Sequence, residues 1–254
     1  MSTTLREWLK KEPFTLTMSS GFFGFYAHLG FLSVLEEENI LPDKITGSSA
    51  GALVGAIFAS GLSTSEIKEF LFELKKENFW DPLGIGGLLK GDKFKKLLDH
   101  IIPVRNINNT KIKLKLSVFN LTKKRTDILE NGDLINAVYA SCAVPFMFQP
   151  QLINKNIYFD GGVLDRAGIK GVEANERVFY HHLISNSLWR KKLKLGAEIP
   201  KKDNMLAFSI KDLPKVRPNK LENGVQAYNK AREATKKALD MNIKIIDSIN
   251  QVIF

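Results

Sequence analysis

The order of hydrophobic and polar positions along the chain predicts alternating strands and helices. Short segments rich in apolar residues at 14–18, 177–184 and 205–210 are typical of buried strands. The segment 111–116 alternates strictly between lysine and an aliphatic residue, which predicts a strand with one solvent-facing side. Further strands are expected at 126–129 and within 151–159. Apolar stripes at helical spacing predict helices at 25–38, 67–76, 92–101 and 222–253, and from Asp133 to about Cys142.

This alternation indicates the α/β class, with a mostly parallel central sheet flanked by helices. The chain has 254 residues, enough for one large domain. It contains no internal repeat, no low-complexity segment and no linker strong enough to divide it. We therefore expect a single domain over residues 1–254.

Composition and charge restrict the classes of partner. The hydrophobic fraction of 44% with 25% charged residues is that of a globular protein. The net charge of +10 favours anionic partners, either nucleic acid or a membrane surface. No zinc-finger spacing or RNP-like aromatic motif is present, so nucleic acid is not expected and peripheral contact with an anionic membrane is the remaining expectation. The single cysteine, Cys142, excludes an internal disulfide framework and a cysteine-based metal site. No metal and no cofactor are expected.

The first thirteen residues carry charges of both signs and no apolar core, so they do not resemble a signal peptide. Two stretches without Asp, Glu, Lys or Arg, 14–35 and 45–65, are long enough to span a bilayer but rich in Ser, Thr and Gly. We interpret them as buried strand–loop–helix units. The expected location is cytoplasmic or peripheral to a membrane, with leaderless export left open.

The second of these stretches contains the pentapeptide 47–51, which has the form G-x-S-x-G with Ser49 at its centre. An apolar run precedes it and small apolar residues follow it, which is the strand–turn–helix setting of a nucleophile elbow. A side chain at Gly47 or Gly51 would clash with neighbouring backbone in such a tight turn. The following helix would direct its N-terminal N–H groups at a developing oxyanion.

Two other short segments carry candidate chemistry. The loop 19–24 follows the first predicted strand and opens a helix, so its N–H groups could cradle an anion. Asp160 precedes Gly161 and Gly162, which places an acid on a tight turn. Taken alone, the loop also fits an ordinary glycine turn, and Asp160 also fits a turn cap.

Together these segments resemble the patatin-like phospholipases. The residues that carry the resemblance are 47–56 (GSSAGALVGA) with 59–61, 137–145 (AVYASCAVP) before the aspartate, and 158–164 (YFDGGVL) around it. The resemblance covers about 14–168, which we take as the core of the domain, with 169–254 as a C-terminal part. It implies a patatin-like fold related to the α/β-hydrolases.

The resemblance also implies the site. Ser49 would be the nucleophile and Asp160 its base, in a dyad without histidine. The oxyanion loop would be 19–24, with Ser20, Gly21, Phe22 and Gly24 as its hole; Gly47, Gly51, Gly161 and Gly162 would shape the elbow and the aspartate turn. The chain departs from the family pattern in this loop, with serines at 19 and 20 where bacterial members usually carry glycines and Phe23 in place of a frequent arginine.

The implied function is a serine lipid acyl hydrolase that cleaves phospholipids or lysophospholipids through an acyl-Ser49 intermediate. The alternatives are a soluble esterase or thioesterase acting on small acyl esters, and a lipid-binding protein whose altered loop impairs catalysis. A histidine triad remains open as a mechanism, because His181 and His182 follow Asp160 in the order Ser…Asp…His. The aromatic residues Phe22, Phe23, Phe25 and Tyr26 would suit an acyl chain or the core.

Overall fold

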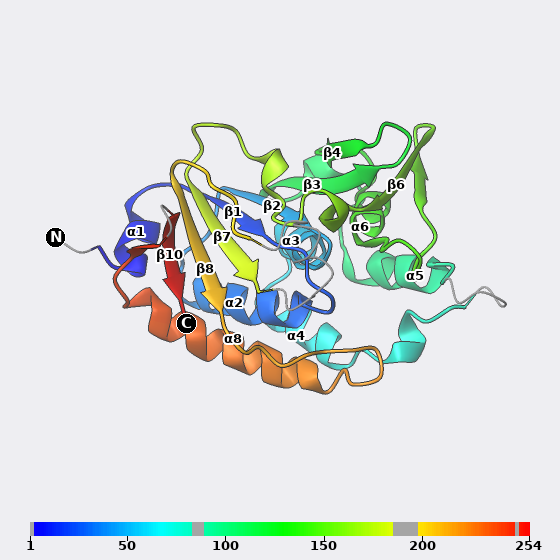
Figure 1. Cartoon of the computed structure of the whole chain (residues 1–254). Helices are drawn as coiled ribbons and strands as arrows, with labels where there is room; N and C mark the ends of the chain where they lie inside the picture. Colours follow the sequence, from blue (N-terminus) through cyan, green and yellow to red (C-terminus); the bar gives the residue numbers. More distant parts are fainter. Residues whose placement is uncertain (1–2, 83–88, 185–197, 247–248) are drawn as a thin grey trace.

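A ten-stranded mixed sheet runs through the part of the chain that the computed structural model describes, residues 3–82, 89–184, 198–246 and 249–254 (Figure 1). The strands are β1 (Thr15–Met18), β2 (Lys44–Ser48), β3 (Lys113–Asn120), β4 (Arg125–Leu129), β5 (Gln151–Ile153), β6 (Asn156–Asp160), β7 (Val178–Leu183), β8 (Met205–Ile210), β9 (Lys244–Ile246) and β10 (Ile249–Ile253). Their order is β5-β6-β3-β2-β1-β7-β8-β10-β9, with β4 paired to β3 beside this path.

The centre of the sheet is parallel. Neighbours from β3 through β2, β1, β7 and β8 to β10 pair in parallel, whereas β4, β5, β6 and β9 pair antiparallel. Every residue of β1, β2, β7 and β8 is buried. Both faces of these strands are covered, so threonines of β1 and β2 and histidines of β7 are buried together with the apolar side chains. The predicted α/β class with a mostly parallel sheet is confirmed.

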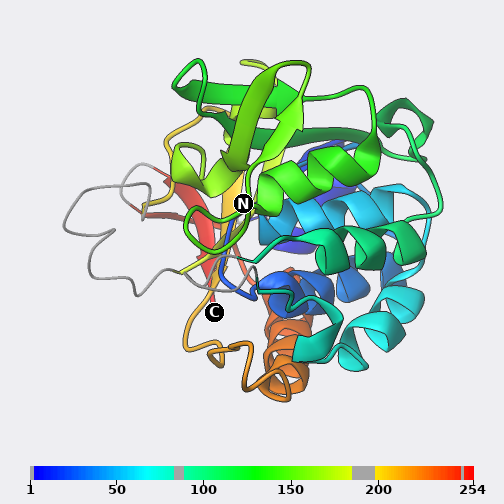
Figure 2. The same cartoon turned by 90° about the vertical axis from the view of Figure 1, so that its right-hand side faces the viewer.

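Seven helices cover the sheet within the described residues. They are α1 (Leu5–Lys11), α2 (Phe25–Glu37), α3 (Ala50–Ala59), α4 (Thr64–Phe72), α5 (Asp92–Ile101), α6 (Leu134–Cys142) and α8 (Asn223–Leu239), with short 3-10 turns η1 (Lys76–Asn78), η2 (Ile107–Asn109), η3 (Gly161–Val163) and η4 (Ile169–Gly171). In Figure 2, α2 to α6 and α8 gather on one side of the sheet. The other side carries a smaller cluster in which Ile169 and Val172 pack near Tyr180 of β7. None of the described helices combines the length and apolar character that crossing a membrane requires.

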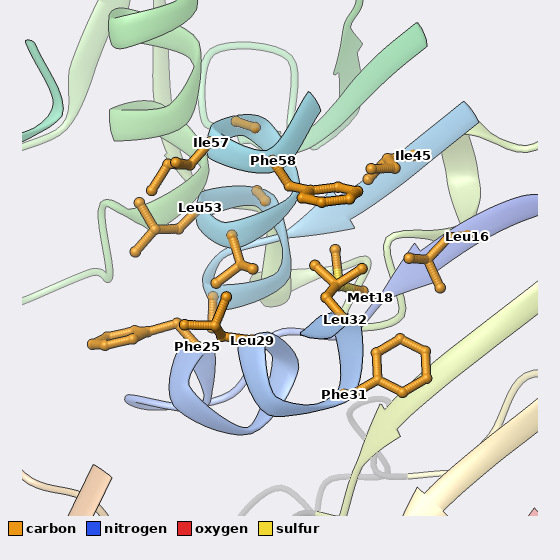
Figure 3. Close-up of a cluster of buried hydrophobic side chains, with 14 of the residues drawn as sticks. Leu16, Met18, Phe25, Leu29, Phe31, Leu32, Ile45, Leu53, Ile57 and Phe58 are labelled. Atoms are coloured by element: carbon orange, nitrogen blue, oxygen red, sulfur yellow. The ribbon is translucent and has the colours of Figure 1, made fainter. Parts of the chain in front are cut away.

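The main apolar core lies between the first two strands and the helices that follow them. Figure 3 shows Leu16 and Met18 of β1 and Ile45 of β2 facing side chains of α2 and α3, among them Leu32 and Phe58. These residues are almost fully buried. Burial of this kind contributes roughly 1.5–3 kcal/mol per large side chain. It holds both helices against the ends of β1 and β2, where the two loops of interest lie.

The predicted helix over 222–253 is wrong beyond its first half. The helix α8 ends at Leu239, and the chain then forms β9 and β10, with β10 in parallel register beside β8. Isoleucines at 246, 249 and 253 have a spacing that fits a helix, but β-branched residues favour strands. The open edge of β8 supplies the hydrogen-bond partners that decide between the two.

Candidate active site

Ser49 lies at the turn between β2 and α3 with a backbone conformation of φ 54° and ψ −117°. Few non-glycine residues adopt such angles, and they persist where surrounding contacts enforce them. A Cβ added to Gly47 would lie 2.7 Å from the backbone N of Ala52, and one added to Gly51 would lie 2.2 Å from the carbonyl O of Met18. Both glycines therefore allow the close approach that the motif predicts.

Two residues of α6 hold the backbone of Ser49. The hydroxyl of Ser141 accepts a hydrogen bond from the N–H of Ser49 at 3.0 Å and donates one to the carbonyl O of Ser117 at 2.8 Å. The thiol of Cys142 contacts the carbonyl O of Ser49 at 3.3 Å. The sequence reasoning assigned neither residue a role; the available signal was a serine inside an otherwise apolar helix. Ser141 thus clamps the elbow to β3.

Asp160 ends β6 and caps η3 from the other side of the elbow. Its Oδ1 accepts a hydrogen bond from the N–H of Gly162 at 2.7 Å, and the residue is 6% exposed. A Cβ added to Gly161 would lie 2.1 Å from the carbonyl O of Ser117, and one added to Gly162 would lie 2.5 Å from the hydroxyl of Ser20. The turn that contains Asp160 therefore packs directly against the loop 19–24 and against β3, the strand beside the elbow.

A second buried acid, Asp165, has a different environment. Its carboxylate accepts hydrogen bonds from the hydroxyl of Ser117 at 2.6 Å and from the N–H groups of Ile169 and Lys170 at 3.1 and 3.0 Å. These bonds cap the turn η4 and occupy both carboxylate oxygens. Asp160 lines the cavity described below, whereas Asp165 does not.

In the loop 19–24, Ser20, Gly21, Phe22 and Gly24 all line the same cavity. The N–H of Ser20 donates to the carbonyl O of Arg166 at 2.7 Å, and that of Gly24 donates to Gly21 at 2.8 Å. Within the described chain, the N–H groups of Gly21 and Phe22 have no hydrogen-bond partner. Of the four residues expected to form the hole, these two offer their N–H groups to a ligand.

Two buried histidines, His28 and His181, lie against the loop 19–24, and His28 contacts its backbone. Nε2 of His28 lies 2.8 Å from the carbonyl O of Ser19, and its Nδ1 lies 2.9 Å from Nδ1 of His181. Because a carbonyl can only accept, Nε2 of His28 carries the proton, its Nδ1 accepts, and Nδ1 of His181 donates. Burial lowers the pKa of His28 to about 4 and that of His181 well below its usual value, so both rings stay neutral.

The hydrogen bonds of His28, His181 and His182 are made away from Ser49 and Asp160. Nδ1 of His182 lies 2.8 Å from the hydroxyl of Tyr180, and neither His181 nor His182 lines the cavity that holds Ser49 and Asp160. The geometry therefore does not support the histidine triad. His28 and His181 instead form a hydrogen-bonded pair that contacts the backbone of the loop 19–24 at Ser19.

The cavity has a volume of about 810 Å³ and contains Ser49 and Asp160 in its wall. Most of its remaining lining is aromatic and aliphatic, including Leu53, Phe94 and Phe148. Of the four aromatic residues singled out from the sequence, Phe22, Phe23 and Phe25 line it. Tyr26 instead belongs to the core and donates its hydroxyl to the carbonyl O of Leu71 at 3.1 Å. The site is thus an apolar pocket with a few converging polar groups, the usual form of a small-ligand site.

The described residues contain no group of three His, Cys, Asp or Glu side chains arranged to hold a metal ion. Cys142 also lines the cavity, but burial and the nearby charge of Asp160 raise the pKa of its thiol well above the usual value. Among the described lining residues, the nucleophile candidate is Ser49.

This chain belongs to the patatin-like phospholipase family, whose family model matches residues 16–172. An uncharacterised NTE family protein of Mycobacterium tuberculosis is 29% identical over 167 residues, covering 63% of this chain and 46% of that protein. A protein named lysophospholipase NTE1 from Meyerozyma guilliermondii is 25% identical over 164 residues, covering 62% of this chain and 11% of its own length. The chain therefore spans less than half the length of these relatives.

Among solved structures, VipD from Legionella pneumophila has the same fold. It superposes with a TM-score of 0.68 at 17% sequence identity, covering 90% of this chain and 67% of VipD. The family predicted from the three sequence segments is confirmed, and so is its fold.

Proposed function

We propose that the protein is a serine lipid acyl hydrolase that cleaves fatty acyl esters of phospholipids or lysophospholipids. The observation that carries this proposal is the placement of Ser49, Asp160 and the loop 20–24 in the wall of one apolar cavity. Membership of the patatin-like phospholipase family supports it, as does similarity to a relative named lysophospholipase.

In the proposed first step, the hydroxyl of Ser49 attacks the ester carbonyl while Asp160 accepts its proton. The N–H groups of Gly21 and Phe22, with the N-terminal end of α3, stabilise the negative charge that forms on the carbonyl oxygen. Collapse of the tetrahedral intermediate expels the alcohol, which takes the proton from Asp160, and leaves an acyl-Ser49 ester. Water, deprotonated by Asp160, then attacks this ester, and Asp160 returns the proton to the oxygen of Ser49 as the fatty acid leaves.

A carboxylate is a weak base, with an ordinary pKa of about 3.9, far below that of a serine hydroxyl. The arrangement favours proton transfer in two ways. Asp160 is 6% exposed, and little water competes with Ser49 for it. Donors that stabilise the oxyanion also lower the energy of the state in which Asp160 holds the proton.

Because the lining of the cavity is mostly apolar, we propose that the fatty acyl chain of the substrate binds there, next to Ser49. Departures from the family pattern at Ser20 and Phe23 leave the backbone donors of Gly21 and Phe22 in place. We therefore favour a productive enzyme over a binding protein with an impaired loop.

The test is fatty acid release from phospholipid vesicles and from lysophospholipid micelles by the wild type and three variants. We expect Ser49→Ala and Asp160→Asn each to lose a factor of about 1,000 or more in turnover. The matched control is Ser48→Ala, since the neighbouring hydroxyl is buried and makes no hydrogen bond within the described residues. We expect this control to keep near wild-type activity.

Retained activity in Ser49→Ala would refute the proposed nucleophile. Hydrolysis of small soluble esters with no release from either lipid would indicate a soluble esterase instead. A wild type that releases no acid from any ester would indicate a lipid-binding role.

A further inference from the structure

Four exposed apolar side chains belong to the cavity lining or are sequence neighbours of lining residues. Phe22 and Ile184 line the cavity and are 57% and 43% exposed. Phe146 is 92% exposed and lies between two lining residues, and Leu164 is 51% exposed and directly follows another. Phe146 has the largest exposure among the large hydrophobic side chains of the described residues. These four side chains come from four separate segments that meet at one cavity.

The backbone at Phe146 is strained and firmly held. Its φ of 66° lies in the left-handed region, which is unfavourable for a bulky residue. The N–H groups of Met147 and Phe148 both donate to the carbonyl O of Val144 at 3.0 Å, and Leu89 exchanges backbone hydrogen bonds with Met147 and Gln149 at 2.8 and 3.0 Å. These hydrogen bonds hold a tight turn that leaves the phenyl ring of Phe146 exposed to solvent.

Positive charge accompanies these apolar groups. Among the described residues, the charged ones in the cavity wall are Asp160, Arg166, Lys215 and Arg217. Lys215 and Arg217 are exposed on the loop after β8 and form no ion pair with any described residue. Exposed apolar side chains next to cations without ion-pair partners in the described residues are complementary to a lipid bilayer, which has an apolar interior and anionic headgroups.

We propose that this cavity-mouth surface, made of Phe22, Phe146, Leu164, Ile184, Lys215 and Arg217, docks on an anionic lipid bilayer. The apolar tips insert between headgroups while Lys215 and Arg217 contact lipid phosphates. The cavity then opens directly onto the membrane, so a lipid reaches Ser49 without crossing water. Delivery of lipid to Ser49 rests on the proposed function, whereas binding to the membrane involves no catalytic step.

The experiment measures binding of the full chain to vesicles by sedimentation. It uses a Ser49→Ala background, so that the lipids stay intact. The vesicles are phosphatidylcholine alone, or phosphatidylcholine with about one third phosphatidylglycerol. The test variant is Phe146→Ser with Leu164→Ser, two residues outside the cavity lining.

The matched control is Leu121→Ser with Leu152→Ser, which removes two leucines of 42% and 65% exposure at the β3–β4 turn and in β5. Neither leucine lines the cavity.

We expect the test variant to lower the partition coefficient on anionic vesicles about tenfold or more, because two apolar side chains no longer leave water. The control should stay within about twofold of the wild type. Lys215→Glu with Arg217→Glu should weaken binding to the anionic vesicles strongly and to phosphatidylcholine alone little, with the difference shrinking at high salt.

Three outcomes would overturn the docking surface. They are no binding of the parent protein to either vesicle, equal loss in the test and control variants, and normal binding of the test variant. Self-association that Phe146→Ser abolishes, without vesicle binding, would assign the surface to a second copy of the chain.

A short-chain soluble ester separates this inference from the proposed function. With Ser49 present, the test variant should keep hydrolysis of that ester while losing hydrolysis of vesicle lipid. If the wild type cleaves no ester yet binds vesicles through Phe146 and Leu164, the proposed function fails and the docking surface stands. If the test variant cleaves vesicle lipid at the wild-type rate, the docking surface fails and the hydrolase stands.

Discussion

Replacing Ser141 by alanine removes the clamp between α6, the elbow and β3. The Ser141 hydroxyl is fully buried, accepts from the N–H of Ser49 at 3.0 Å and donates to the carbonyl O of Ser117 at 2.8 Å. Each hydrogen bond contributes roughly 1 kcal/mol, and a buried group left unpaired costs roughly 1–3 kcal/mol. We therefore expect Ser141→Ala to lower the free energy of unfolding by about 2–4 kcal/mol.

A suitable control is Ser60, the C-terminal cap of α3, the helix that follows Ser49. Ser60 is 3% exposed, and its hydroxyl makes one hydrogen bond, to the carbonyl O of Ile57 at 2.7 Å. Ser60→Ala removes the same atom from a similarly buried place but loses one hydrogen bond and leaves the elbow untouched. Its expected cost is about 1 kcal/mol.

Urea denaturation of both variants tests the stability difference, and steady-state kinetics test the consequence for the site. The conformation of Ser49 is unfavourable without enforcement, so the loss of its N–H partner should let the elbow relax. We expect kcat to fall about tenfold or more in Ser141→Ala with KM within about twofold, and no change in Ser60→Ala. Equal stability loss in the two variants, together with full kcat in Ser141→Ala, would refute the clamp.

Three further predictions follow from burial and close packing. Gly51→Ala should destabilise the fold by more than about 3 kcal/mol, because the new Cβ would lie 2.2 Å from the carbonyl O of Met18. The control Gly132→Ala, which has no atom within 4 Å but a φ of 91°, should cost only about 1 kcal/mol. Thermal unfolding of both variants measures the difference. The pKa of His28 is about 4 in the folded state and near 6.5 in the unfolded state, so the unfolded state binds more protons in this interval. Stability should therefore fall by up to about 3 kcal/mol as pH decreases from about 6.5 to about 4, and a flat urea midpoint for the wild type over this interval would contradict it. Because burial raises the pKa of Cys142, iodoacetamide at about pH 8 should modify the native thiol about 100-fold more slowly than the unfolded one, as mass spectrometry would show.

Local sequence was enough for the elements whose signals lie close together. The capping residue Asp133 accepts from the N–H of Asn136 at 2.7 Å at the start of α6, as the turn 131–133 predicts. The box formed by Ser63 and Glu66 opens α4 in the same way. Caps and apolar runs involve neighbours in the chain, so their outcome depends little on the rest of the fold.

The C-terminal part shows where local sequence was insufficient. The spacing of apolar residues after Leu239 fits a helix, but pairing with β8, about forty residues earlier in the chain, makes it a strand. Strand formation depends on the partner that the sheet provides, and no local pattern contains that partner.

The candidate site likewise has some features that follow from local sequence and others that depend on tertiary packing. The sequence by itself determined Ser49 on its glycine-flanked turn, the loop 19–24 and Asp160 on its turn, because each depends on residue types that only a few consecutive positions supply. Tertiary structure decided that the N–H groups of Gly21 and Phe22 find no partner among the described residues, that Ser141 clamps the elbow, and that Phe146 stands exposed next to lining residues of the cavity. These features arise from contacts between segments up to about a hundred residues apart, and the packing of the sheet and its helices creates them.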